Sequence, residues 1–154
     1  MSAIMTHPLR LHLQSLLLGL LLPALAHGQT FHWVGGSGDW GDASHWSATP
    51  DGPGGAGVPR QGDPVLLAPL ERTTITIGRT AWCGGLRISG DAAPVMITGA
   101  TIAELRVHGG LELSGEVRWD LPGALRFGGT AEGMPIDAGN VVIGSDVVFD
   151  GSGS

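Results

Sequence analysis

Two seven-residue stretches decide the fold of this chain: GGLRISG at residues 84–90 and GGLELSG at residues 109–115. They begin 25 residues apart, and a looser copy, GALRFGG, begins at Gly123. Apolar and polar residues alternate between the glycines of each copy, which predicts a strand with one buried face. Glycine leaves room for a sharp corner at each end. Strand and corner units that repeat in this way predict a parallel β-solenoid.

Short runs of the same kind fill the chain after residue 63. They are rich in aliphatic and β-branched residues and are separated by glycine, whereas no segment after residue 28 has a sustained helical period. We therefore predict an all-β domain with strands at residues 64–68, 73–78, 85–89, 94–98, 104–108, 110–114, 116–120, 124–127, 140–144 and 146–150.

The alternation also predicts which side chains face the core. The apolar pairs expected there are Leu86 and Ile88, Leu105 and Val107, Leu111 and Leu113, Val117 and Trp119, and Leu125 and Phe127. Polar residues lie between the members of each pair and are expected to face water, the arginines among them being Arg87, Arg106, Arg118 and Arg126.

A β-sandwich or an up-and-down barrel is the alternative architecture, because hairpins also give short strands at regular spacing. The dipeptides that most strongly mark hairpin turns are Asn-Gly and Asp-Gly. Here Asp-Gly occurs only at residues 51–52, within a proline-rich segment, and at residues 150–151. This scarcity favours the solenoid.

Residues 1–28 are predicted to be an export signal. Arg10, with no acidic residue beside it, precedes an apolar stretch of about a dozen residues, and small residues then offer cleavage after Ala26 or Gly28. An uncleaved anchor is the alternative, but a spanning helix needs about 20 apolar residues. No later stretch is long and apolar enough to cross a bilayer as a helix. We therefore expect a secreted or bacterial cell-surface protein.

The charge of the chain limits the classes of molecule that it is expected to bind. The net charge is −6 and the chain has no lysine, so its surface repels phosphate backbones and a nucleic-acid partner is not expected. Cys83 is the only cysteine, so the fold cannot depend on an internal disulfide, and the thiol is expected to be a small buried hydrophobe.

Three of the five tryptophans fall in WVGGSGDWGDASHW, residues 33–46. Two interpretations are open. The rings form a buried plug in a protein with few other large side chains, or they form an exposed platform that stacks on sugar rings while carboxylates accept hydrogen bonds from sugar hydroxyls. The binding residues of the second interpretation are Trp33, Trp40, Trp46, Asp39 and Asp42. The irregular spacing favours a compact cluster.

This segment, together with GVPRQGDPVLL at residues 57–67, resembles the module that opens many large secreted bacterial surface proteins, including autotransporter-type adhesins and giant exported proteins of gliding bacteria. His45 stands where that family usually has Asn. The matching positions are Trp33, Gly35, Gly36, Trp40, Trp46, Gly57, Pro59, Gly62, Asp63 and Val65.

The resemblance implies a cap at residues 29–64 over the first turns of a right-handed β-helix-like stalk, with a β-strand repeat region at residues 65–154. Asp63 is then expected at a turn, its carboxylate bonded to backbone N–H groups. Because the chain stops just after a predicted strand, we expect the repeat region to continue beyond Ser154.

Residues typical of reactive sites are sparse. The histidines after the leader, His27 (if it is retained), His32, His45 and His108, lack metal-site spacing, and no calcium loop, phosphate loop or nucleophile elbow is present. We expect no metal, no cofactor and no enzymatic activity. Carboxylate pairs for glycoside cleavage assemble in space, and the candidates for them are Glu116, Asp120 and Glu132.

The leading hypothesis is a non-catalytic, exported structural or adhesin module of a bacterial surface protein. The alternative is a carbohydrate-binding module that holds a polysaccharide or a cell-surface glycan on exposed tryptophans. A third hypothesis is a β-helix enzyme that degrades polysaccharides. The sequence does not specify an oligomeric state.

Overall fold

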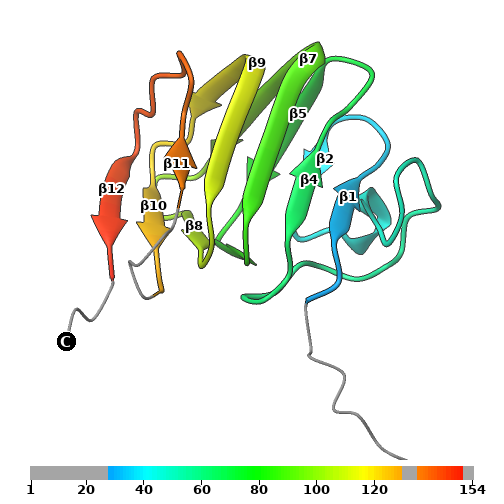
Figure 1. Cartoon of the computed structure of the whole chain (residues 1–154), viewed down its shortest axis with the longest axis horizontal. Coiled ribbons are helices and arrows are strands. Elements are labelled where there is room, and N and C mark those ends of the chain that lie inside the picture. Colours follow the sequence, from blue (N-terminus) through cyan, green and yellow to red (C-terminus); the bar gives the residue numbers. More distant parts are fainter. Residues whose placement is uncertain (1–27, 130–134, 151–154) are drawn as a thin grey trace, which may run out of the picture.

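Parallel strands coil into a β-solenoid of about four turns in the computed structural model of the chain, which describes residues 28–129 and 135–150 (Figure 1). The single helix among these residues is the short 3-10 helix η1 (Ala43–His45). Strands of successive turns pair in parallel, so the predicted solenoid is confirmed and the alternative β-sandwich is wrong. The predicted export signal lies, except for Gly28, outside the described residues.

Each turn of the coil has up to three faces. The first face consists of β1 (Phe31–Trp33), β4 (Val65–Leu67), the first parts of β7 (Leu86–Gly99) and β9 (Leu111–Asp120), and β11 (Ile136–Asp137). The second face consists of β2 (Gly38–Asp39), β5 (Thr73–Ile77) and the later parts of β7 and β9. The third face consists of β6 (Thr80–Cys83), β8 (Glu104–Val107), β10 (Ala124–Phe127) and β12 (Asp146–Phe149).

The two ends of the coil differ. At the end where β1 lies, β3 (Trp46–Ser47) pairs antiparallel with β1 and the chain folds over the first turn. At the other end β12 is the outermost strand of the third face (Figure 1). Val147 and Phe149 occupy the same inward register positions as Leu125 and Phe127 of β10. They are 45% and 66% exposed, whereas their counterparts on β10 are buried.

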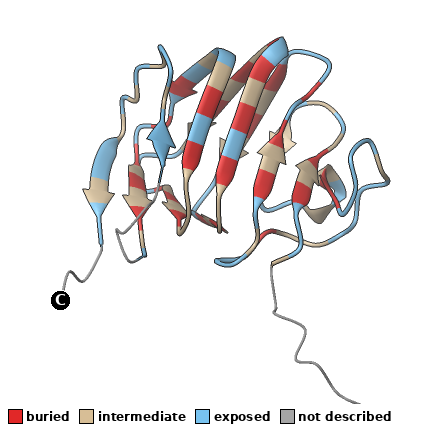
Figure 2. Cartoon of the chain, viewed as in Figure 1, coloured by how far each residue is buried: buried red, intermediate tan, exposed pale blue. Residues whose placement is uncertain are grey.

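The core is a set of apolar ladders that run along the coil (Figure 2). Residues in register on successive turns stack on one another, as Ile88 does on Leu113 and Leu105 does on Leu125. All the predicted inward pairs are buried, except that Val117 is only partly buried. The repeat in the sequence is therefore the repeat of the core.

Glycine forms the corner between the first and second faces. Gly115 has a φ of +69°, and a Cβ there would collide with the backbone of Gly90 and Asp91 on the preceding turn. A Cβ on Gly90 would in turn collide with the backbone of Glu116. Both positions end the ISG and LSG motifs, so the motif marks a place where two turns touch at their backbones.

Several predicted strands require correction. The pairs predicted at 85–89 and 94–98, and at 110–114 and 116–120, are each one strand, β7 and β9, because the pairing between the two turns resumes after the glycine corner with a shift of register between Gly90 and Val95. Residues 140–144 are not a strand, although Val141 and Ile143 pack against the core. Five short strands of two to four residues were not predicted, namely β1, β2, β3, β6 and β11.

Candidate functional site at the tryptophan-rich end

The three tryptophans of the 33–46 segment form one buried cluster. Trp33 and Trp46 lie opposite each other on the antiparallel pair β1 and β3, with ring centroids 5.0 Å apart. Trp40 follows β2, which pairs with β5, and its centroid is 4.8 Å from that of Trp46. Relative exposures are 5% for Trp33, 2% for Trp40 and 0% for Trp46.

Burial of these rings favours the plug over the platform. A sugar platform needs open ring faces, and the faces of Trp33, Trp40 and Trp46 are instead covered by one another and by the first turns. The exposed platform expected under the second interpretation is therefore not what these rings form. Phe31 joins the cluster edge-on to Trp46 at 6.2 Å.

Hydrogen bonds fix two of the three indoles. Trp46 Nε1 donates to the carbonyl of Trp40 at 2.7 Å, and Trp33 Nε1 donates to the carbonyl of Gly36 at 3.1 Å. Trp40 Nε1 is buried and has no acceptor among the residues that the structure describes. The Trp40 N–H is thus the one indole donor of the cluster without a hydrogen bond among the described residues.

Both carboxylates of the segment hold local turns. Asp39 Oδ1 accepts the backbone N–H of Gly41 at 2.7 Å. Asp42 caps η1, with Oδ1 accepting the backbone N–H of Ser44 at 2.9 Å and its hydroxyl at 2.8 Å. These hydrogen bonds, that from the Ser44 backbone foremost, lower the pKa of the Asp42 carboxyl below its ordinary value. The side chains are exposed, but each has a structural task in its loop.

His45 takes over the corner where the resembling family has Asn. Its ring stacks on Trp33 with the centroids 4.7 Å apart and the planes 4° from parallel, and its Nδ1 lies 3.2 Å from the carbonyl of Val34. Asp63 behaves as expected, since its Oδ2 accepts the backbone N–H of Arg60 at 2.8 Å.

A cleft of about 370 Å³ lies between the cap and the third face. Asp39 and Trp40 line it from the cap, with Pro59 beside them, and Arg79 and Trp82 line it from the β5–β6 corner and β6. No sequence motif marked this cleft, because its walls come from two turns of the coil that are brought together only by the fold. Two predicted binding residues, Asp39 and Trp40, do reach it.

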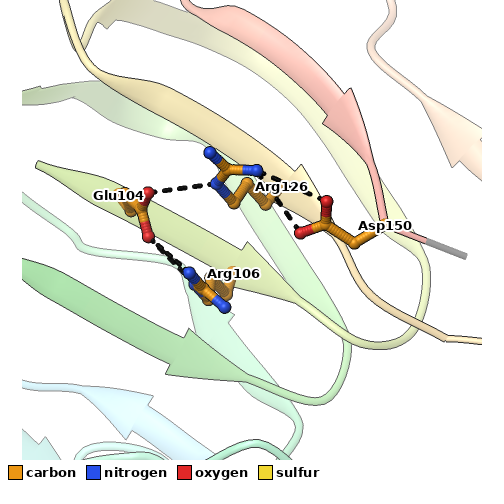
Figure 3. A network of polar contacts seen from close by, with 4 residues as sticks. All are labelled: Glu104, Arg106, Arg126 and Asp150. Atoms are coloured by element: carbon orange, nitrogen blue, oxygen red, sulfur yellow. Dashed lines mark hydrogen bonds and ion pairs between the residues drawn. The ribbon is translucent and has the colours of Figure 1, made fainter.

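An ion-pair network covers the outer side of the third face (Figure 3). Glu104 bonds Arg106 at 2.8 Å and Arg126 at 3.1 Å, and Arg126 also reaches Asp150 at 3.3 Å. The Arg106 guanidinium foremost, followed by that of Arg126, lowers the pKa of the Glu104 carboxyl. These two arginines face outward as predicted, but they are half-buried in the network and not simply solvated.

Trp82 adjoins this network. The Arg106 guanidinium carbon lies 4.9 Å from the centre of the Trp82 ring. The His108 ring stacks on the Trp82 ring with the two centroids 5.6 Å apart. His108 is not simply solvated, because its Nδ1 lies 3.2 Å from Gln61 Nε2 and its own Nε2 is buried. Cys83, at the end of the same strand, is fully buried as expected, and burial raises the pKa of its thiol.

The carboxylates considered for glycoside cleavage do not form a close pair. Glu116 and Asp120 are four residues apart on β9, which places their backbones about 13 Å apart at about 3.3 Å per residue. Glycosidase carboxylates lie closer, at about 5–9.5 Å. Asp120 is also paired with Arg118 at 2.6 Å. Glu132, the third candidate, lies outside the described residues.

Within residues 28–129 and 135–150, no group of three His, Cys, Asp or Glu side chains is arranged to hold a metal ion. The described part of the chain also has no helix of sufficient length and apolarity to span a membrane.

No protein-family model matches this chain, and comparison with curated proteins and with solved structures gives no match. The resemblance to bacterial surface modules therefore rests on the motif residues and stays a prediction.

Proposed function

We propose that this chain is a non-catalytic, exported structural module: a capped β-solenoid that serves as the base of a bacterial surface or extracellular protein. The observation that carries the proposal is the interlocked cluster of Trp33, Trp40 and Trp46 over the first turn. A solenoid end otherwise presents core side chains and unpaired strand edges, which invite aggregation. A plug of large rings suits a protein that must hold its shape as an isolated, extended support.

The ladder construction supports the same role. Parallel strands stack in register along the coil, with Leu86 on Leu111 in the core and, outside it, Arg87 paired to Glu112 at 3.1 Å. Each turn therefore buries its apolar row against its neighbours, which is how repeat proteins build rigid, elongated shapes.

Location is the first test of the proposal. The chain is produced with an epitope tag at its C-terminal end in the organism that encodes it, and cells are fractionated. We expect the tagged protein outside the cytoplasm, with His27 or Gln29 as its new N-terminus. An unprocessed chain that stays in the cytoplasm contradicts the proposal.

The role of the cap is tested by Trp46→Ala in the purified protein. Because Trp46 lies at the centre of the cluster, its truncation is expected to lower the free energy of unfolding by about 3–5 kcal/mol and to increase self-association. Denaturant unfolding and light scattering measure the two effects. Trp82→Ala, outside the cap, is the matched control. If Trp46→Ala stays stable and monomeric but loses retardation on polysaccharide-loaded native gels, the cap role is refuted and glycan binding is favoured.

A further inference from the structure

Among the described residues, the first turn of the coil has no strand on the third face. It supplies β1 to the first face and β2 to the second, but β6 is the last strand of the third face at this end. After Trp40 the chain leaves the coil through η1 and returns near Val58. The cleft of about 370 Å³ lies along β6, where a third-face strand of the first turn would lie, and Thr80, Ala81 and Trp82 form its wall.

The backbone of β6 is open toward this cleft. The carbonyls of Arg79 and Cys83 accept hydrogen bonds from Glu104 and His108 at 2.8 and 3.0 Å, so these alternate residues point toward β8 and its neighbours. Backbone groups of the intervening residues, Thr80 and Trp82, therefore point the other way. No partner for them occurs among the hydrogen bonds of the described residues.

The same edge already pairs at its far end. The backbone N–H of Gly84, two residues beyond Trp82, donates to the carbonyl of Asp63 at 2.7 Å. Asp63 lies just before β4 in the sequence. The cap segment therefore pairs with this edge through the Gly84–Asp63 hydrogen bond, but it does not pair with Thr80 or Trp82. An added strand on Thr80 and Trp82 would extend an interface that the fold has begun.

The indole of Trp40 gives independent support for an occupant. It lines the cleft, it is 2% exposed, and its N–H has no acceptor among the described residues. A buried donor without a partner costs free energy, and the other two indoles of the cluster each have a carbonyl acceptor. A ligand carbonyl in the cleft would give the Trp40 N–H the acceptor that it lacks.

We propose that this cleft binds an extended peptide segment that adds to β6 as a strand. Its backbone pairs with Thr80 and Trp82, and one of its carbonyls accepts the Trp40 N–H. Ala81 and Cys83, the inward residues of β6, are already covered, so the inward side chains of the peptide must be small. Arg79, at one end of the cleft, makes no ion pair within the described residues and favours an acidic residue there. This inference does not depend on the proposed structural role.

The test begins with a random heptapeptide library displayed on phage, selected against the wild-type protein and against Thr80→Pro. Proline at the first residue of an edge strand removes an N–H that the sheet does not use, so the fold is expected to persist. We expect wild-type protein to enrich peptides with small alternate residues, and a synthetic copy to bind Thr80→Pro at least tenfold more weakly. No enrichment, or equal binding to Thr80→Pro, overturns the proposal.

Nuclear magnetic resonance locates the peptide. The five tryptophans give five indole signals in protein labelled with ¹⁵N-tryptophan, and Trp40→Phe assigns one of them. We expect the selected peptide to shift the Trp40 signal and to bind Trp40→Phe about tenfold more weakly, while Trp33→Phe, a matched truncation elsewhere in the cluster, binds normally. Cellohexaose serves as the glycan probe. If it shifts the Trp40 signal and the peptide does not, the site is a sugar site and the proposal fails.

Discussion

At the scale of single residues, contact between successive turns explains why glycine recurs at the corners. Gly90 and Gly115 lie in register on β7 and β9, and each leaves room for the backbone of the neighbouring turn. Gly62 lies at a turn as well, yet a Cβ there would meet no atom within 4 Å. Glycines that look equivalent in the sequence thus differ in whether the structure has room for a side chain at their position.

Gly115→Ala is expected to lower the free energy of unfolding by about 2–5 kcal/mol. A left-handed backbone conformation costs an L-residue about 1–2 kcal/mol, and overpacking against the preceding turn adds about 1–3 kcal/mol. Gly62→Ala is the control and should change stability by no more than about 0.5 kcal/mol. Urea unfolding of both variants measures the difference, and equal effects would show that the corner tolerates a side chain.

The sequence revealed this corner only in part. The repeated ISG and LSG motifs placed a glycine there, and alternation assigned Leu86, Ile88, Leu111 and Leu113 to the core correctly. Alternation did not reveal that the strand continues past the corner, because glycine inside a strand weakens the strand and often marks a bulge or a tight bend. Extended backbone on both sides, held by pairing with the next turn, overrides that local preference.

At the scale of elements, pairing decided which runs became strands. β6 has small and polar residues, Thr80, Ala81 and Cys83 among them, and no propensity pattern marks it, but β8 lies in register beside it. Residues 140–144 have the composition of a strand but are not paired with a neighbouring strand and do not form one. β-propensity expresses how well a side chain fits a half-buried sheet. Whether a run becomes a strand therefore depends on the neighbouring turn that it pairs with, and the composition of the run alone does not show this.

The ladder of the third face makes stability depend on pH through Glu104. Arg106 and Arg126 lower the pKa of Glu104 in the folded protein, so its contribution is fully present above the unfolded pKa of 4.5 and is lost as the pH falls through the folded pKa. Wild-type protein is therefore expected to melt at a higher temperature than Glu104→Gln at pH 7, and this difference in melting temperature is expected to shrink as the pH falls below 4.5.

Thermal melts across pH 3–7 measure this gap. Glu112→Gln provides the comparison, because Glu112 pairs with an exposed arginine, Arg87, and such surface pairs contribute little. A gap between wild type and Glu104→Gln that does not change with pH would mean that the network stabilises the face through packing alone.

At the scale of the whole molecule, the candidate site was partly visible in the sequence. The motif between Trp33 and Trp46 predicted a cluster at one end, and the buried alternative among its two interpretations matches the structure. The cleft beside it was invisible, because Trp40 and Trp82 meet there only after the chain has completed a turn. Sites of this kind form where turns stack, so local spacing does not disclose them.

The end of the coil opposite the cap allows a last prediction. Val147 and Phe149 are exposed apolar residues on an outermost strand, a combination that promotes self-association. The double variant Val147→Thr and Phe149→Ser is expected to raise solubility and lower association, while losing about 1 kcal/mol of stability with the Phe127–Phe149 stack at 5.3 Å.

The matched control makes the same changes one turn earlier, at Leu125 and Phe127, which occupy the same register positions but are buried. Truncating buried residues at these positions costs several kcal/mol, so this variant is expected to unfold. Sedimentation velocity and thermal melting distinguish the two. If the Val147 and Phe149 variant unfolds as well, these side chains are core residues in solution, and some other surface covers the end of the coil.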